Sequence, residues 1–248
     1  MQIYDALIIG CGYASVGFAR KNKNVIICEE HQICDTGFYL PARCYEHFPY
    51  RAKTAEGKRL ENFFTQLSLF LNGQQNLNGF ECALCGYLVE NPTEILLKCR
   101  IVDIKRGADG LFDVSIYTNE GITHLLAKSL INAKGSGLGK KITVLFTTDN
   151  FESEKEKLLS AFPGAEIERA FYNERYAIHI KADGFDENSV KLWIYKKWCE
   201  IESGAKILYI APVLYGDGDG QNPLCDANYK NPIEAFEAGY LLLSEDKK

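Results

Sequence analysis

Several features are missing from this sequence, and each absence removes a class of protein. No apolar run approaches the ~20 residues that a membrane-spanning helix needs. The first residues carry Asp5 within their apolar stretch and no basic segment before it, unlike a signal peptide. No long run of one charge sign occurs, and the formal net charge is −5, which argues against a nucleic-acid-binding surface. We therefore expect a cytoplasmic protein without a membrane span or a nucleic-acid partner.

The nine cysteines show no disulfide or metal framework. Their odd number and irregular spacing favour reduced thiols. Cys82 and Cys85 form a C-x-x-C pair, which we interpret as core cysteines, with a redox pair as the alternative. Cys34 and Cys44 lie in a loop after the second strand, where a redox disulfide is the less favoured alternative. Neither a second C-x-x-C nor a histidine pair stands at zinc-site spacing, so no metal site is predicted.

An apolar strand, a glycine turn and a short helix open the chain. Apart from Asp5, residues 3–9 form an apolar run, as expected for a strand of a parallel sheet that is covered on both faces. The run ends at Gly10, which allows a sharp turn. Gly12 follows, and it has no side chain that would block an approaching phosphate. The helix is predicted over residues 13–21.

The start of this helix is the predicted phosphate site. A helix N-terminus offers free N–H groups and a favourable dipole to an anion. Tyr13, Ala14 and Ser15 occupy the first helical positions. Ser15 stands where the third glycine of the dinucleotide fingerprint falls, so we expect helix and strand to pack less closely there.

An acid ends the second predicted strand. Residues 25–28 are apolar, and Glu29 and Glu30 follow them. Glu29 lies roughly 20 residues beyond the first glycine, where a carboxylate accepts hydrogen bonds from the two ribose hydroxyls. A carboxylate there would repel a 2′-phosphate, which disfavours NADP. The unit therefore predicts a bound dinucleotide, and the alternative is a sheet of this type that has lost its ligand.

The spacing of apolar residues predicts the helices and strands in the rest of the chain. Helices are predicted over residues 54–71, 80–90, 152–161, 190–201 and 232–243. Strands are predicted over residues 95–105, 112–118, 122–126, 129–133, 142–147, 166–171, 175–181 and 206–215. In the middle segment, Arg169, Arg175, Tyr176 and His179 are interpreted as exposed strand residues, with a substrate-facing group as the alternative.

Four stretches together resemble the FAD-dependent oxidoreductases of the glutathione-reductase-like type, in the broad group that includes FixC-like flavoproteins. These stretches are residues 4–12, 25–29, 130–135 and 208–217. The resemblance implies that Ala133 and Gly135 pass close to the adenosine half of FAD and that Asp217 binds its ribityl chain. It also implies that the backbone near Val102 lies at the adenine.

We therefore predict an α/β fold with an FAD/NAD(P)-binding Rossmann-type parallel sheet, a β-meander and a small inserted antiparallel α+β domain. Residues 1–139 and 206–248 form the FAD-binding domain, and residues 140–205 form a smaller substrate-side domain. The predicted function is that of an FAD-dependent oxidoreductase acting on an unidentified small-molecule substrate. The alternatives are a flavoprotein-like binding or regulatory protein without catalysis, and an NAD-binding protein.

Overall fold

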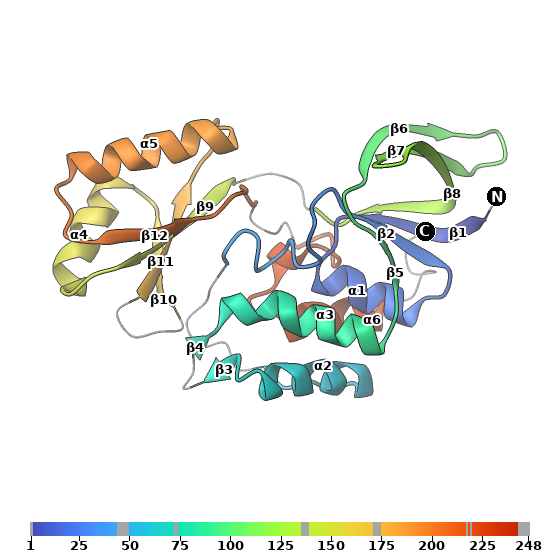
Figure 1. Cartoon of the computed structure of the whole chain (residues 1–248), viewed down its shortest axis with the longest axis horizontal. Helices are drawn as coiled ribbons and strands as arrows, with labels where there is room; N and C mark the ends of the chain where they lie inside the picture. The colour runs from blue at the N-terminus through green and yellow to red at the C-terminus, as the bar shows by residue number, and fades with distance from the viewer. Residues whose placement is uncertain are drawn as a thin grey trace.

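A six-stranded sheet forms the larger part of the molecule (Figure 1). The computed structural model describes residues 2–43, 50–71, 74–134, 139–170, 175–216, 218 and 220–242. In order across the sheet, the strands are β5 (Glu94–Leu96), β2 (Val25–Cys28), β1 (Ile3–Ile9), β8 (Gly121–Asn132), β7 (Phe112–Thr118) and β6 (Arg100–Arg106). The strands β5, β2, β1 and β8 are parallel, whereas β8, β7 and β6 form an antiparallel meander.

The central strands are buried because both faces of the sheet are covered. On one face, Ile8 and Ile27 pack into a core with the helices α1 (Tyr13–Lys21) and α6 (Pro232–Leu241). On the other face, Leu7 and Ile26 pack against residues of the meander. Burial on both faces is the reason that β2, and β1 apart from Asp5, are apolar runs rather than alternating ones.

Two further helices complete the helical face, as Figure 1 shows. They are α2 (Ala55–Gln66) and α3 (Phe80–Glu90). The helix α2 begins at Thr54, whose side chain accepts a hydrogen bond from the Gly57 N–H. Short elements join these helices and precede α6, namely β3 (Phe70–Leu71), β4 (Gln74–Gln75), η1 (Leu77–Gly79) and η2 (Asp226–Asn228).

A four-stranded antiparallel sheet forms the second part of the molecule. Its strands, in order, are β10 (Glu166–Arg169), β11 (Arg175–Lys181), β9 (Lys141–Thr147) and β12 (Lys206–Ile210). The helices of this part are α4 (Phe151–Ala161) and α5 (Glu187–Glu200). The ring of Trp198 lies 5.7 Å from that of Phe146 and 6.1 Å from that of Phe162, so an aromatic core joins helix to sheet.

The structure differs from the sequence-based expectation at one helix and at several strands. The helix predicted over residues 54–71 ends at Gln66, and Phe70–Leu71 form the strand β3 instead. The predicted strand over residues 95–105 is two strands, β5 and β6, at opposite edges of the sheet, with Lys98 between them at a positive φ of 56°. The strands predicted over 122–126 and 129–133 are one strand, β8, because the chain contains no turn residue between them. Residues 206–210, which fall within the predicted FAD-binding domain, pair with β9 of the second sheet. The division into domains stays a prediction.

No helix among the described residues is long and apolar enough to cross a membrane.

Candidate functional site

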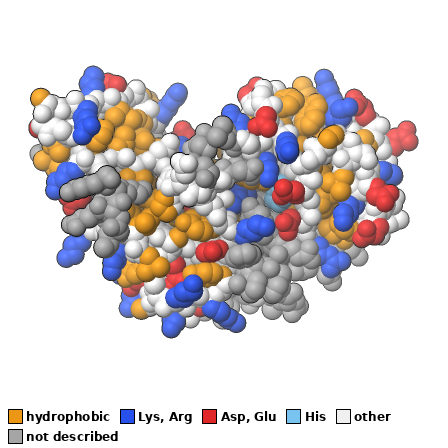
Figure 2. All heavy atoms as spheres, turned by 180° about the vertical axis from the view of Figure 1, so that it is seen from behind, with side chains coloured by type: hydrophobic (Ala, Val, Ile, Leu, Met, Phe, Trp, Pro, Cys, Tyr) orange, Lys and Arg blue, Asp and Glu red, His pale blue; other side chains and the backbone are white. Residues whose placement is uncertain are grey.

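The candidate site lies where three parallel strands end together. The register pairs Ile9 with both Cys28 and Asn132, so β1, β2 and β8 share one carboxyl-terminal edge. A cavity of about 460 Å³ opens at this edge and is lined from both parts of the molecule. From behind, the surface is hollowed between the two parts, and acidic and basic side chains are interspersed on that face (Figure 2). Ligands of open parallel sheets bind beyond this edge of the strands.

The turn after β1 has the backbone that the sequence predicts. Gly10 has a φ of +103°, in the region that side-chain-bearing residues rarely adopt. The Ser15 hydroxyl, buried on α1, donates to the Gly10 carbonyl oxygen at 3.0 Å. Ser15 therefore closes the turn with a hydrogen bond at the position where a third glycine was expected.

Glu29 is buried at the end of β2 and reaches back to the turn. Its Oε2 accepts the Cys11 N–H at 2.8 Å, and its Oε1 accepts the His31 N–H at 2.9 Å. The His31 ring Nδ1 lies 2.7 Å from the same Oε1. Burial acts to raise the pKa of Glu29, but the hydrogen bonds from His31 and Cys11 outweigh it and lower the pKa.

An ion pair spans the rim of the cavity. The ammonium group of Lys134, two residues after the end of β8, pairs with the exposed Glu30 carboxylate. The Lys134 stem lies over the glycine turn, since a Cβ added to Gly10 would be 2.9 Å from the Lys134 Cγ. Glu29 and Glu30 thus lie at the same end of the cavity, and Lys134 covers the turn between them and α1.

The N-terminus of α1 carries a protein carboxylate. Asp226 Oδ2 accepts the Tyr13 N–H and Asp226 Oδ1 accepts the Ala14 N–H, each at 2.9 Å. Gly12, the residue before the helix, has no side chain with which to cap it. Burial raises the pKa of Asp226, although the two N–H donors and the charge of Arg43 act in the opposite direction. Asp226 therefore caps a helix from more than 200 residues away along the chain.

Arg43 holds the segment that carries Asp226. Its guanidinium is buried and donates to the carbonyl oxygens of Gly37 at 2.8 Å, Asp226 at 3.1 Å and Tyr229 at 2.9 Å. It also lies 4.9 Å from the ring centre of Phe38. A planar group with five donors can join two loops in this way, and a lysine could not.

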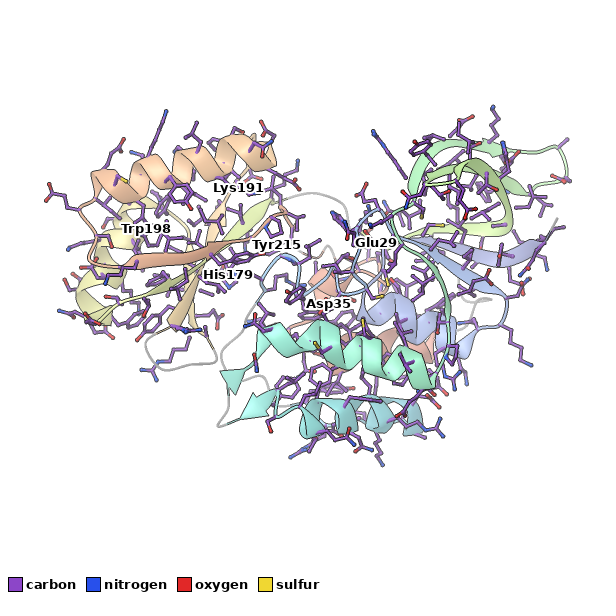
Figure 3. The ribbon with its side chains drawn as sticks, viewed as in Figure 1. Glu29, Asp35, His179, Lys191, Trp198 and Tyr215 are labelled. Atoms are coloured by element: carbon purple, nitrogen blue, oxygen red, sulfur yellow. The ribbon has the colours of Figure 1, made fainter. Side chains whose placement is uncertain are left out.

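Asp35 is a buried acid beside this site (Figure 3). Its Oδ1 accepts the Phe38 N–H at 2.8 Å, whereas its buried Oδ2 has no hydrogen-bond partner among the described residues. Burial, together with the neighbouring charges of Asp226 and Glu81, raises the pKa of Asp35 to about 8. Asp35 is therefore largely protonated at neutral pH.

Cys34, Glu81 and Cys85 form a cluster whose ligand atoms all lie within 4.8 Å of one another. Glu81 already accepts two backbone N–H groups, from Cys34 at 3.0 Å and from Asp35 at 2.7 Å. The Cys85 thiol lies 3.4 Å from the same carboxylate. Through these hydrogen bonds, Glu81 joins the loop after β2 to α3, and the arrangement needs no metal ion.

The C-x-x-C cysteines lie on α3, as the sequence predicts, but they do not share one environment. Cys82 is exposed and Cys85 is half-buried, so the interpretation of the pair as core cysteines is wrong for Cys82. All eight described cysteines are free thiols. Cys44 lies outside the described residues, so the Cys34–Cys44 alternative stays untested.

In the second part, Tyr215 faces the cavity and contacts a buried histidine. The Tyr215 hydroxyl lies 2.7 Å from His179 Nδ1, and the Thr143 hydroxyl lies 3.1 Å from the same nitrogen. Figure 3 shows Tyr215 and Glu29 on the two facing sides of the junction. The exposed-residue interpretation holds for Arg169 and Arg175, but Tyr176 and His179 are buried. Tyr176 is buried against the rings of Phe146 and Phe151, whereas His179, on the other face of β11, is buried beside Thr143 and Tyr215.

The structure gathers most of the predicted site residues at the cavity. Those that line it are Gly10, Gly12, Ser15, Glu29, Glu30 and Ala133. Tyr13 and Ala14 adjoin it through their backbone N–H groups. Val102 is half-exposed on β6 and does not line the cavity. The strand β6 nevertheless starts close to the site, because the N–H of Cys99, just before β6, donates to the Glu29 carbonyl oxygen. Gly135 and Asp217 lie outside the described residues.

Sequence reasoning missed Asp226, Arg43 and Tyr215. Asp226 stands in an irregular segment after a proline, and no local pattern marks it as a cap for a helix near the N-terminus. Arg43 is a single arginine in a loop without a clear period. Only the arrangement of the two loops against α1 gives these side chains their contacts.

Comparison with solved structures identifies the fold. The p-nitrophenol 4-monooxygenase PnpA from Pseudomonas putida DLL-E4 matches 94% of this chain and 78% of its own, with a TM-score of 0.52 and 12% identity. BexE, studied for oxidation during BE-7585A biosynthesis, matches 86% of this chain and 52% of its own, with a TM-score of 0.52 and 12% identity. The chain has the FAD-binding Rossmann-type flavoprotein fold.

This result confirms the predicted fold class, including the parallel sheet with a meander and the separate antiparallel sheet. A complex of aklavinone-11 hydroxylase with FAD and aklavinone is also similar, with a TM-score of 0.48, 12% identity and 85% of this chain covered. The chain spans about half the length of that hydroxylase, 53%, and of BexE, 52%. No protein-family model matches the sequence, and no curated protein matches it.

The site fits a dinucleotide at one end only. At the ribose end, Glu29 Oε2 accepts one hydrogen bond and retains acceptor capacity, whereas Oε1 already contacts both the N–H and the ring nitrogen of His31. At the pyrophosphate end, the two N–H groups at the start of α1 are already bound to Asp226. A Cβ added to Gly12 would lie 2.3 Å from Asp226 Oδ2, so that carboxylate fills the space over the turn.

Proposed function

We propose that this chain is an FAD-dependent oxidoreductase, of the glutathione-reductase-like, FixC-like type, that acts in the cytoplasm on a small-molecule substrate. A bound flavin would supply the redox chemistry, and the protein would bind, orient and shield it.

The observation that carries the proposal is the buried Glu29 carboxylate at the end of β2, beside the Gly10 turn. Its Oε2 lies 2.8 Å from the Cys11 nitrogen, so the acid is held against the turn rather than in solvent. In this fold an acid at that place receives the ribose hydroxyls of the adenosine half. Ala133 lines the same cavity from the end of β8. Roles for Val102, Gly135 and Asp217 in binding FAD remain part of the proposal.

A second candidate is a flavoprotein-like binding or regulatory protein that keeps the fold without the reaction. The observation that favours it is the Asp226 carboxylate on the α1 N-terminus, where an anionic ligand would otherwise bind. An NAD-binding protein is a third candidate, because NAD and FAD share the adenosine half-site.

The absorption spectrum of the purified full chain, before and after addition of FAD, tests the proposal. We expect flavin bands near ~375 and ~450 nm that travel with the protein through gel filtration. Glu29→Gln keeps the shape of the side chain and removes its charge, so we expect it to weaken FAD retention. Glu120→Gln, in an exposed turn between β7 and β8, is the matched control.

A protein that stays colourless with excess FAD would contradict the enzyme proposal. Titration with NAD would then separate the remaining candidates. Retention of FAD that is equal in wild type, Glu29→Gln and Glu120→Gln would instead mean that the flavin binds elsewhere.

A further inference from the structure

An anion at the start of α1 would need the free N–H groups of Tyr13 and Ala14. In this protein both groups donate to one carboxylate, and each Asp226 oxygen accepts one of them at 2.9 Å. This two-oxygen arrangement reproduces the way in which a phosphate group uses the same end of a helix. Two of the N–H groups that the α1 N-terminus offers at the pyrophosphate position are therefore already used.

The space at this position is filled as well. A Cβ on Gly12 would lie 2.3 Å from Asp226 Oδ2, and a Cβ on Gly37 would lie 2.1 Å from the same oxygen. The carboxylate thus lies between two glycine backbones that leave no room for a second group. A phosphate brought to the same place would also meet a like charge at short range.

The carboxylate is fixed by its surroundings rather than free to turn into solvent. Asp226 is 5% exposed. Its own carbonyl oxygen and that of Gly37 accept hydrogen bonds from the buried Arg43 guanidinium. The following helix, α6, packs directly on α1, where a Cβ on Gly239 would lie 1.9 Å from the Ala14 carbonyl oxygen. Moving Asp226 away therefore requires rearrangement of η2 and of the loop that carries Gly37.

We propose that Asp226 is a built-in occupant of the pyrophosphate position, which makes this site discriminate against diphosphate-bearing ligands while its ribose end at Glu29 stays open. Binding of a dinucleotide then requires the Asp226 carboxylate to leave the α1 N-terminus. This inference rests on the proposed function for the identity of the ligand. It goes further in naming Asp226 as the residue that controls entry of that ligand.

The test compares three ligands in wild type and in Asp226→Ala by calorimetric titration of the full chain. FAD and ADP both carry a pyrophosphate, whereas adenosine carries only the ribose and base. We expect Asp226→Ala to bind FAD and ADP roughly tenfold to thirtyfold more tightly than wild type, as a charge effect at a helix terminus allows. We expect its affinity for adenosine to be unchanged.

The matched control is Asp186→Ala. Asp186 caps α5 from the adjacent position in the chain, since its Oδ1 alone accepts the N–H groups of Asn188 and Ser189 at 2.9 and 3.0 Å, and it is exposed on the second part. We expect this variant to bind all three ligands as wild type does.

Asp226→Asn, which keeps the size of the side chain, is the second variant should Asp226→Ala fail to fold, and we expect a smaller gain for FAD and ADP. Circular dichroism and thermal midpoints establish that each variant is folded.

The outcomes separate this inference from the proposed function. If wild type does not bind FAD and Asp226→Ala does, the inference holds and the enzyme proposal fails for the natural protein. If wild type binds FAD tightly and Asp226→Ala binds it equally or less tightly, the inference is overturned and the enzyme proposal stands. If neither protein binds FAD or ADP, or if adenosine gains as much as ADP, the inference is overturned.

Discussion

At the scale of single residues, the site holds more buried acid than buried base. Asp35, Asp226 and Glu29 are all buried, and Arg43 is the buried cation beside them among the described residues. The pKa of each acid depends on the balance between its burial, which raises the pKa, and its hydrogen bonds, which lower it. Glu29 accepts several donors and has a lowered pKa, whereas Asp35 has an unpartnered oxygen and a raised one. The burial of these groups predicts two measurable dependences on pH.

The first prediction concerns Asp35. Its pKa is raised from 3.8 to about 8 by burial, so between these values the folded chain holds a proton that the unfolded chain has lost. Wild type should therefore lose stability as pH rises through this interval. Asp35→Asn removes this dependence. The free energy of unfolding of Asp35→Asn, relative to that of wild type, should therefore rise with pH by up to about 1.4 kcal/mol per pH unit. Urea denaturation at several pH values measures the difference.

Asp183→Asn, on an exposed turn of the second part, is the control and should show no such trend. A difference between Asp35→Asn and wild type that is equal at about pH 5 and about pH 7.5 would mean that Asp35 is ionised in the folded protein.

The second prediction concerns the pair of His31 with Glu29. The hydrogen bond to Glu29 raises the pKa of His31 above its usual 6.5. A raised histidine pKa stabilises the folded state fully below the unfolded value and loses that effect as pH rises through the folded value. The stability that wild type has over His31→Asn should therefore be larger at about pH 6 than at about pH 9. Thermal unfolding at the two pH values measures it.

His124→Asn is the comparison, because it removes a pair with Asp113 that is exposed on the meander. Exposed pairs contribute little, so the change with pH should be smaller there. An effect of His31→Asn that does not vary with pH would show that the charged form of His31 does not contribute.

At the scale of elements, the crossing of α1 and α6 decides how the two ends of the chain meet. A Cβ on Gly17 of α1 would lie 2.0 Å from the Phe236 carbonyl oxygen, and one on Gly239 of α6 would lie 1.9 Å from that of Ala14. The helix backbones thus touch directly. This contact holds η2, and with it Asp226, against the start of α1.

The third prediction tests this contact. Gly239→Ala should destabilise the protein by roughly 1–3 kcal/mol, the usual cost of overpacking, because backbone cannot move aside as a side chain can. Gly86→Ala on α3 is the matched control, since its Cβ would be 3.0 Å from the ring of Phe63, which can turn. Chemical denaturation measures both. Equal effects of the two substitutions would contradict a rigid crossing.

Elements with a local cause were the most predictable from the sequence. The strand, turn, helix and strand over residues 3–28 follow from apolar runs and glycines and occur as predicted. The helix over 80–90 is likewise confirmed. The predicted strand over 95–105 was wrong, because its two halves pair with β2 and β7, which lie far apart across the sheet. Pairing between strands that are distant in sequence does not change the local spacing of apolar residues, so the sequence pattern does not reveal it.

At the scale of the whole molecule, the cavity is shared between the two parts. Gly10 and Glu29 line it from the larger part, and Lys140, Glu187 and Tyr215 line it from the second. A ligand in the cavity would therefore contact both parts at once.

The fourth prediction follows from this shared lining. Saturation of the full chain with FAD should slow amide hydrogen exchange in residues 10–16 and also in residues 213–216, which are remote in sequence. The turn between β6 and β7, around Gly110, lies away from the cavity and should be unchanged. Mass spectrometry of peptides reports all three segments. Protection confined to residues 10–16 would contradict a site shared by the two parts.

The sequence by itself determined the parts of this protein that depend on near neighbours. These are the glycine turn, the α1 N-terminus and the acid at the end of β2, all within one short stretch of chain. Only the tertiary structure decided what occupies that turn. Asp226 lies 213 residues from Tyr13, and it reaches the helix because α6 crosses α1 and Arg43 joins the two loops. Periodicity and spacing report contacts within an element, whereas a side chain that caps a distant helix is set by packing alone.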